Sequence, residues 1–309
     1  MPFELCRRTF LKRSALTSAA ALTGWYAGGG GATAHAIEPI QRNGHSFFKF
    51  SLAAYSYRDL LNAKSPESRL TLEDFIADCA KMNLQGTELT SYYFPENPTD
   101  EYLCSLKQLC FRLGLDVSGT AVGNDFCFPP GEERDRQIAD VKRWIDRAAV
   151  LGAPVIRIFS GHPHGTSPAE AHRLCVAATE VCCEYAGEHG VFLALENHGG
   201  LTTESDGLLA LVRDVKSPWF GVNLDTGNFH TADPYGDIAR LAPYALNVQV
   251  KVSIAPAEGA RQHADFRRLA QILTDSGYRG YVVLEFEEDE DPRVACPRTI
   301  DELRAAFTA

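Results

Sequence analysis

The chain has 309 residues and a formal net charge of −10, with 45% hydrophobic and 23% charged residues. This composition is typical of a globular enzyme and allows one large domain or two small ones. A chain this acidic repels phosphate backbones, which argues against a nucleic-acid partner. After residue 36 no stretch stays apolar for the roughly 18 residues that a membrane span needs, so we expect no stable membrane insertion.

The first 36 residues differ from the rest of the chain. Paired Arg7 and Arg8 precede an apolar run rich in alanine, leucine and threonine, which ends in the pattern Ala34-His35-Ala36. This order is typical of a signal for the twin-arginine translocase. We therefore expect a signal peptide at 1–36, a linker at 37–48 and a folded domain at 49–309, exported to the periplasm or beyond. A disordered basic tail is the alternative.

Nine cysteines are spread along the chain without a Cys-x-x-Cys pair, so they do not indicate a disulfide framework. Twin-arginine export carries folded proteins, which would allow the thiols to be buried before export. We expect mostly buried, reduced cysteines.

The rest of the chain alternates strand and helix in order. The helical patterns begin at 71–83, where Thr71 and Asp74 occupy capping-box positions, and continue at 135–152, 168–190, 265–278 and 296–307, with a short one at 237–241. Eight β-rich runs lie between and around them, at 50–55, 86–89, 116–122, 155–160, 191–196, 220–225, 247–252 and 281–287.

This alternation indicates an α/β fold with a parallel sheet, and eight units in about 260 residues match a closed (β/α)8 TIM barrel. A doubly wound open sheet is the alternative. That fold usually has a glycine-rich phosphate loop after its first strand, and the sequence has none there.

Strand parity predicts which polar side chains meet inside the barrel. Alternate side chains face the interior, and the apolar positions of the last four strands face the helices. The inward positions near the C-terminal mouth are then Glu196, His198, Asp225, Gln249, Lys251, Glu285 and Glu287. By the same parity Glu88 and Arg157 reach this mouth, whereas His162 and His164 read as a solvated loop.

Three carboxylates in one closed site cannot all ionise unless a cation neutralises them. A divalent metal held by Glu196, Asp225, Gln249 and Glu285 is the simplest solution. The alternative is that these carboxylates pair with Lys251 and Arg157, because an inward lysine in a barrel needs an anionic partner.

The segments "LALENHGG", "GVNLDTGNFH", "NVQVKV" and "YVVLEFEE" together resemble the sugar-phosphate isomerase/epimerase, or xylose-isomerase-like, TIM-barrel superfamily. The resemblance implies one divalent metal on Glu, Asp, His and Glu from strands five to eight, which here are Glu196, Asp225, Gln249 and Glu285. Gln249 departs from the common histidine. The set is then all-oxygen, which favours Mn²⁺ or Mg²⁺ over Co²⁺ or Zn²⁺.

The resemblance also implies a sugar isomerase or epimerase that works through an enediolate. Glu196 and Glu285 would be the acid–base pair, with Lys251 on the oxyanion and His198 as a further catalytic group. Substrate contacts would come from Glu88, Arg157, His230 and Glu287. A metal-dependent lyase or hydrolase on oxidised keto sugars, and a non-catalytic sugar-binding barrel, are the alternatives. The particular carbohydrate, and whether the chain forms a homo-oligomer, stay open.

Overall fold

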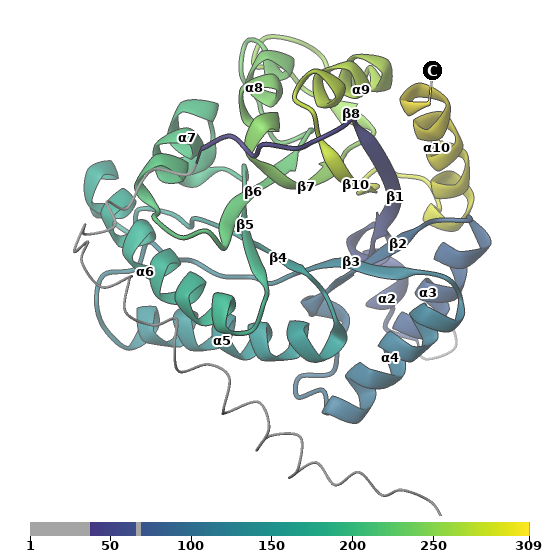
Figure 1. Cartoon of the computed structure of the whole chain (residues 1–309), viewed down its shortest axis with the longest axis horizontal. Helices are drawn as coiled ribbons and strands as arrows, with labels where there is room; N and C mark the ends of the chain where they lie inside the picture. Colours follow the sequence, from purple (N-terminus) through teal and green to yellow (C-terminus); the bar gives the residue numbers. More distant parts are fainter. Residues whose placement is uncertain (1–37, 66–68, 309) are drawn as a thin grey trace, which may run out of the picture. The chain divides into compact units, whose positions relative to one another are not determined.

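The computed structural model describes residues 38–65 and 69–308, and within them the predicted TIM barrel is confirmed. Eight parallel strands close in the order β1-β10-β7-β6-β5-β4-β3-β2, so that β1 lies between β2 and β10 (Figure 1). These strands are β1 (Phe47–Ala53), β2 (Gly86–Thr90), β3 (Asp116–Ala121), β4 (Val155–Ile158), β5 (Phe192–Glu196), β6 (Phe220–Asp225), β7 (Ala245–Val250) and β10 (Arg279–Leu284). The predicted signal at 1–36 lies outside the described residues.

Helices surround the barrel in Figure 1 and separate successive strands. The short helix expected at 237–241 is present and begins three residues earlier. No helix in the described part of the chain is long and apolar enough to cross a membrane. The helices are α2 (Arg58–Leu61), α3 (Leu72–Lys81), α4 (Asp100–Arg112), α5 (Glu132–Leu151), α6 (Pro168–Glu188), α7 (Ser205–Asp214), α8 (Pro234–Leu241), α9 (Phe266–Asp275) and α10 (Pro292–Phe307), with 3-10 turns η1 (Ala54–Tyr57), η2 (Ser91–Tyr93), η3 (Gly200–Thr202) and η4 (Ala242–Tyr244).

The elements that were not predicted from the sequence include a pair of very short strands after β7. The loop after β7 forms a small antiparallel hairpin, in which β8 (Ser253–Ile254) pairs with β9 (Gln262–His263). Each strand has only two residues, which is too short to show the period-two pattern on which sequence prediction depends.

The barrel strands are apolar on their outer side, and several of them carry polar side chains on their inner side. Leu193, Leu195, Val248 and Val250 are fully buried among the core side chains. Inside the barrel, polar side chains bond to each other across strands, and Ser51 Oγ lies 2.7 Å from Ser118 Oγ. Buried polar groups are stable only when they are hydrogen-bonded, so this interior is held by directional bonds as well as by packing.

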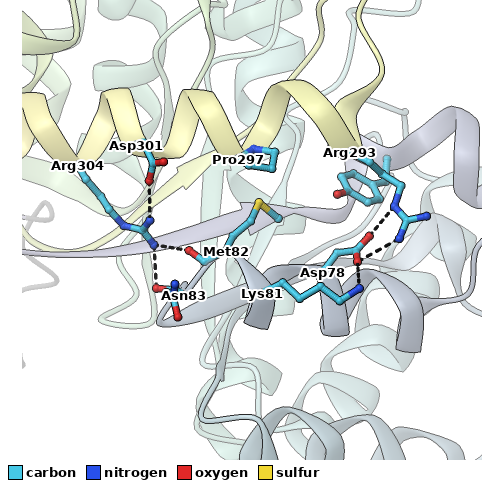
Figure 2. A pocket seen from close by; sticks show the side chains of 9 residues that line it. Asp78, Lys81, Met82, Asn83, Arg293, Pro297, Asp301 and Arg304 are labelled. Atoms are coloured by element: carbon cyan, nitrogen blue, oxygen red, sulfur yellow. Dashed lines mark hydrogen bonds and ion pairs between the residues drawn. The ribbon is translucent and has the colours of Figure 1, made fainter.

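A cavity of about 380 Å³ lies between α3 and α10 (Figure 2). Its charged groups pair with one another: Asp78 Oδ2 is 2.8 Å from Arg293 Nε, and Asp78 Oδ1 accepts from Lys81 Nζ at 2.8 Å. Arg304 donates to the carbonyl oxygens of Met82 and Asn83 at the end of α3, at 2.6 and 2.8 Å. Basic groups stabilise a helix C-terminus, so this cavity is a junction that ties the last helix to α3.

The cysteines match the expectation from the sequence. The eight cysteines within residues 38–65 and 69–308 are free thiols, and Cys104 is the exposed member of this set.

The capping box predicted at the start of α3 is present and generates a stability prediction. Asp74 accepts a hydrogen bond from the Thr71 backbone N–H at 2.9 Å, and this bond lowers the pKa of Asp74. Its contribution is therefore complete above the unfolded-state pKa and is lost as the pH falls through the lower folded-state pKa. We expect Asp74→Asn to reduce the free energy of unfolding at pH 7 by about 1 kcal/mol.

The measurement is urea unfolding from pH 7 to acid, with Glu73→Gln as the matched control. Glu73 is also in the first turn, where an acid favours the helix dipole, but it does not belong to the capping box. The deficit of Asp74→Asn should shrink on acidification and exceed that of the control. A deficit that is independent of pH would contradict this account.

Candidate active site

The polar residues predicted at the barrel mouth come from the ends of four neighbouring strands. Glu196 ends β5, Asp225 ends β6, Gln249 lies near the end of β7, and Glu285 directly follows β10. All four side chains are buried, and Asp225 is completely inaccessible. The sequence places them here because inward positions recur every two residues and parallel strands end at the same rim of the barrel.

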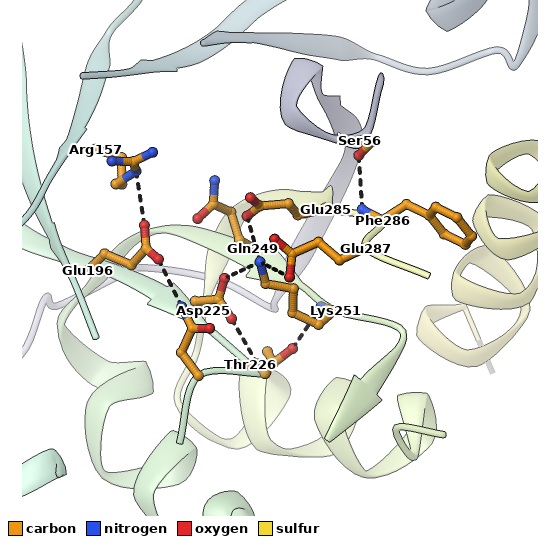
Figure 3. Close-up of polar contacts among 12 residues, drawn as sticks. Ser56, Arg157, Glu196, Asp225, Thr226, Gln249, Lys251, Glu285, Phe286 and Glu287 are labelled. Atoms are coloured by element: carbon orange, nitrogen blue, oxygen red, sulfur yellow. Dashed lines mark hydrogen bonds and ion pairs between the residues drawn. The ribbon is translucent and has the colours of Figure 1, made fainter. Parts of the chain in front are cut away.

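Lys251 lies at the centre of a cluster of carboxylates (Figure 3). Its Nζ atom is 3.3 Å from Asp225 Oδ2, 3.3 Å from Glu285 Oε2 and 3.0 Å from Glu287 Oε2. Burial by itself would lower the pKa of the Lys251 ammonium. The surrounding carboxylates outweigh burial and hold this pKa well above its ordinary value, so Lys251 is a buried, charged cation.

Hydrogen bonds to both its side chain and its backbone hold Asp225 in place. Its Oδ1 atom accepts from the backbone N–H of Gly227 at 2.8 Å, and Asn197 exchanges two hydrogen bonds with its backbone, at 2.8 and 2.9 Å. In contrast, Oδ2 is buried and accepts no hydrogen bond within the described residues, so Lys251 Nζ at 3.3 Å is its charged neighbour. Burial raises the pKa of Asp225, and the ammonium of Lys251 opposes this effect.

A second buried ion pair joins β4 and β5. Glu196 Oε2 lies 2.9 Å from Arg157 Nε, and Glu196 Oε1 accepts from Asn228 Nδ2 at 2.9 Å. The Arg157 guanidinium stacks 3.9 Å from the centre of the Phe159 ring and donates to the Val122 carbonyl at 3.1 Å. Burial raises the pKa of Glu196 and Arg157 lowers it, with burial the larger effect.

Gln249 belongs to a network inside the barrel, just below the mouth. Its Nε2 atom donates to Glu88 Oε1 at 2.7 Å, and its Oε1 atom accepts from Asn223 Nδ2 at 2.6 Å. Asn247 Nδ2 donates to both Glu88 Oε2 and Asn223 Oδ1, at 2.9 Å each. Burial raises the pKa of Glu88 to about 7. Gln249 and Glu88 thus hold each other in place beneath the ion pairs.

His198 and His230 lie at the rim of the mouth. The His198 ring packs 4.5 Å from the Phe159 ring, and burial together with the nearby Arg157 lowers the pKa of His198. His230 Nδ1 lies 3.0 Å from the Ala255 carbonyl, next to a cavity of about 480 Å³. His164, expected in a solvated loop, is exposed as predicted, and its Nε2 atom lies 2.8 Å from Asp125 Oδ2. The 480 Å³ cavity is also lined by Tyr55, Arg58, Asn228, Lys251 and Glu287.

Sequence reasoning placed the ionisable groups and Gln249 but missed Asn197, Asn228 and Phe159, which hold them. Asn197 follows Glu196 directly, and Asn228 belongs to the "DTGNFH" segment. Their proximity to predicted site residues was the available signal. Phe159 carried no such signal, because an aromatic residue after a strand is usually part of the core.

The site can be tested for its fit to Mn²⁺ or Mg²⁺, which need several oxygens converging on one point. The Gln249 carbonyl oxygen already accepts from Asn223, and Glu196 lies against Arg157. The point between Asp225 and Glu285 is taken by Lys251. Among residues 38–65 and 69–308, no three His, Cys, Asp or Glu side chains are placed as metal ligands. The donor set does not fit a metal in this arrangement, and ligation stays a sequence-based prediction.

Solved structures of other proteins share this fold at low sequence identity. D-psicose 3-epimerase from Clostridium cellulolyticum H10, with D-tagatose, has a TM-score of 0.71 and 17% identity over 84% of this chain and 99% of the other. L-ribulose 3-epimerase has a TM-score of 0.69 and 18% identity over 85% and 95%. For 3-keto-D-glucoside 4-epimerase from E. coli the values are 0.65 and 16%, over 84% and 99%. At these identities the likeness establishes the fold alone.

The sequence itself carries the family assignment. No curated protein matches the chain significantly by sequence. The model of one family, described as the xylose isomerase-like TIM barrel, matches residues 76–306 and so covers most of the barrel. The chain therefore belongs to the xylose isomerase-like TIM barrel family.

Proposed function

We propose that this protein is a sugar isomerase or epimerase that moves a proton on a carbon next to a carbonyl group. The observation that carries the proposal is the pair of buried carboxylate–cation contacts at the mouth, Glu196 with Arg157 and Glu285 with Lys251. The family and the fold shared with several sugar epimerases support the same kind of reaction.

The reaction follows from the chemistry of these two contacts. One carboxylate, Glu196 or Glu285, takes the proton from the α-carbon, and the C–H electron pair moves into the carbonyl to give an enediolate. The ammonium of Lys251 and the guanidinium of Arg157 stabilise the negative oxygen. The other carboxyl group, which starts protonated, returns its proton to the opposite face of the same carbon, which is epimerisation. Alternatively a proton is returned to the neighbouring carbon while the hydroxyl proton passes to the former carbonyl oxygen, which is isomerisation.

The remaining candidates bind the substrate rather than react with it. His198, Glu287 and His230 lie around the mouth, where sugar hydroxyls need both donors and acceptors. Glu88 lies deeper and positions Gln249. The Mn²⁺ or Mg²⁺ implied by the resemblance does not fit these side chains as they are arranged, so the proposed reaction uses the two protein cations.

The proposal is tested by isotope exchange. We expect a ketose deuterated at the α-carbon to lose label to water during turnover, observed by NMR over a panel of ketoses and 3-keto sugars. Glu196→Gln and Glu285→Gln keep the shape but remove the base, and each should lower turnover by at least ~10²-fold. Glu184→Gln, at an exposed site on α6, is the matched control and should turn over normally.

Normal rates in both site variants would exclude the two-glutamate proton transfer. Cleavage or elimination products from an oxidised sugar would favour the lyase or hydrolase, and binding without turnover would favour the sugar-binding barrel.

We also propose that the protein is exported through the twin-arginine pathway, on the evidence of Arg7, Arg8 and the Ala34-His35-Ala36 pattern. Replacing both arginines by lysine keeps the charge of the segment but removes the pair that the translocase recognises. We expect this variant to stay in the cytoplasm in a folded state, as measured by cell fractionation and circular dichroism. Unchanged export of the double variant would show that residues 1–36 are not such a signal.

A further inference from the structure

We propose that Lys251 is the resident cation of this site, in the place that a divalent metal would otherwise take. Its ammonium group lies within 3.3 Å of carboxylate oxygens from Asp225, Glu285 and Glu287, contributed by or next to strands β6 and β10. The folded protein then needs no metal to keep these carboxylates together. The inference concerns the resting site and does not depend on which sugar reaction the site performs.

The lysine is built into the fold and does not reach in from the surface. It directly follows β7 at an inward position, its side chain is 9% exposed, and its backbone N–H donates to Thr226 Oγ1 at 3.1 Å. The chain makes room for its stem at Gly227, where an added Cβ would lie 2.7 Å from Lys251 Cβ and closer still to Cγ. A glycine at this point lets the loop after β6 close over the lysine and fix the position of its charge.

Gln249 and Glu196 already use the atoms that a metal would need in other contacts, which favours the lysine over a metal. To supply its oxygen to a metal, Gln249 would have to turn, which breaks its bonds to Asn223 and Glu88. Glu88 would then lose a donor in a buried position, and a buried polar atom without its partner destabilises the folded protein. Glu196 would likewise have to leave Arg157 and Asn228. With Lys251 in place the carboxylates of Asp225 and Glu285 have a charged neighbour, whereas a metal bound by Gln249 and Glu196 would break their present contacts.

Charge balance explains why this cation matters. Lys251 faces Asp225 and Glu285, both buried, together with Glu287, whose side chain is one-third exposed. Without the ammonium these carboxylates would repel each other in a site from which water is largely excluded. A variant without the lysine charge must therefore lose stability or take up another cation.

The experiment measures metal binding and stability on the full-length protein. We expect wild type to purify without stoichiometric metal by mass spectrometry, and its thermal midpoint to be unchanged by EDTA or by millimolar Mn²⁺. Lys251→Met keeps the stem but removes the charge. We expect its midpoint to fall, to be restored by Mn²⁺, and its Mn²⁺ affinity to exceed that of wild type by at least ~100-fold, the scale of one unit charge within about 4 Å.

Two further variants serve as controls. Lys251→Arg keeps the charge and should stay indifferent to Mn²⁺. Lys107→Met removes an exposed lysine from α4 and should not create Mn²⁺ binding.

One metal per wild-type chain, or a midpoint that EDTA lowers, would overturn the proposal, as would a folded Lys251→Met that neither loses stability nor binds Mn²⁺. If Lys251→Met does not fold, the wild-type metal content and EDTA response decide. Failure of the sugar reaction would appear in the isotope experiment and leave these readouts unchanged.

Discussion

The burial of several carboxylates at one end of a closed barrel is the constraint on which the rest of the site depends. Asp225, Glu196 and Glu285 come from strand ends that the fold brings together, and none can reach bulk water freely. A buried carboxylate without a partner is costly, so each one must find a cation or several donors. Lys251 and Arg157 supply the charge, and Asn228 and the Gly227 amide supply hydrogen bonds.

The hydrogen-bonded layer below the mouth lets this charged layer persist. In many barrels branched apolar side chains fill the interior. Here Glu88, Asn223, Asn247 and Gln249 bond to one another across β2, β6 and β7. Each of these groups uses its partners' donors and acceptors, so no single side chain can turn without leaving others unpaired. The network therefore fixes the floor of the site more tightly than apolar packing would.

Strand parity explains why so much of the fold and of the site could be predicted from the sequence. A strict period of two determines on which side of the barrel wall each side chain lies, and it placed Glu196, Asp225, Gln249, Lys251 and Glu285 on the inner side. Parity does not determine partners, because a long side chain can reach several positions from one Cα. Gln249 was expected to face the mouth with a carbonyl oxygen, but its amide bonds to Glu88 and Asn223. The choice of hydrogen-bond partner depends on how far each side chain reaches and on which donors compete for it. The period-two pattern gives no information on either.

A lysine and an arginine in place of a metal would change how the site handles a sugar. A divalent metal can bind two adjacent sugar oxygens and fix their geometry through its own coordination. An ammonium group acts as a single point charge, while a guanidinium presents a planar set of donors. With Lys251 against Glu285 and Arg157 against Glu196, each cation lies against one carboxylate of the proposed proton transfer. In the proposed reaction, a proton that moves onto either carboxylate would weaken its attraction for the cation, which could then turn toward the oxygen that becomes negative in the same step.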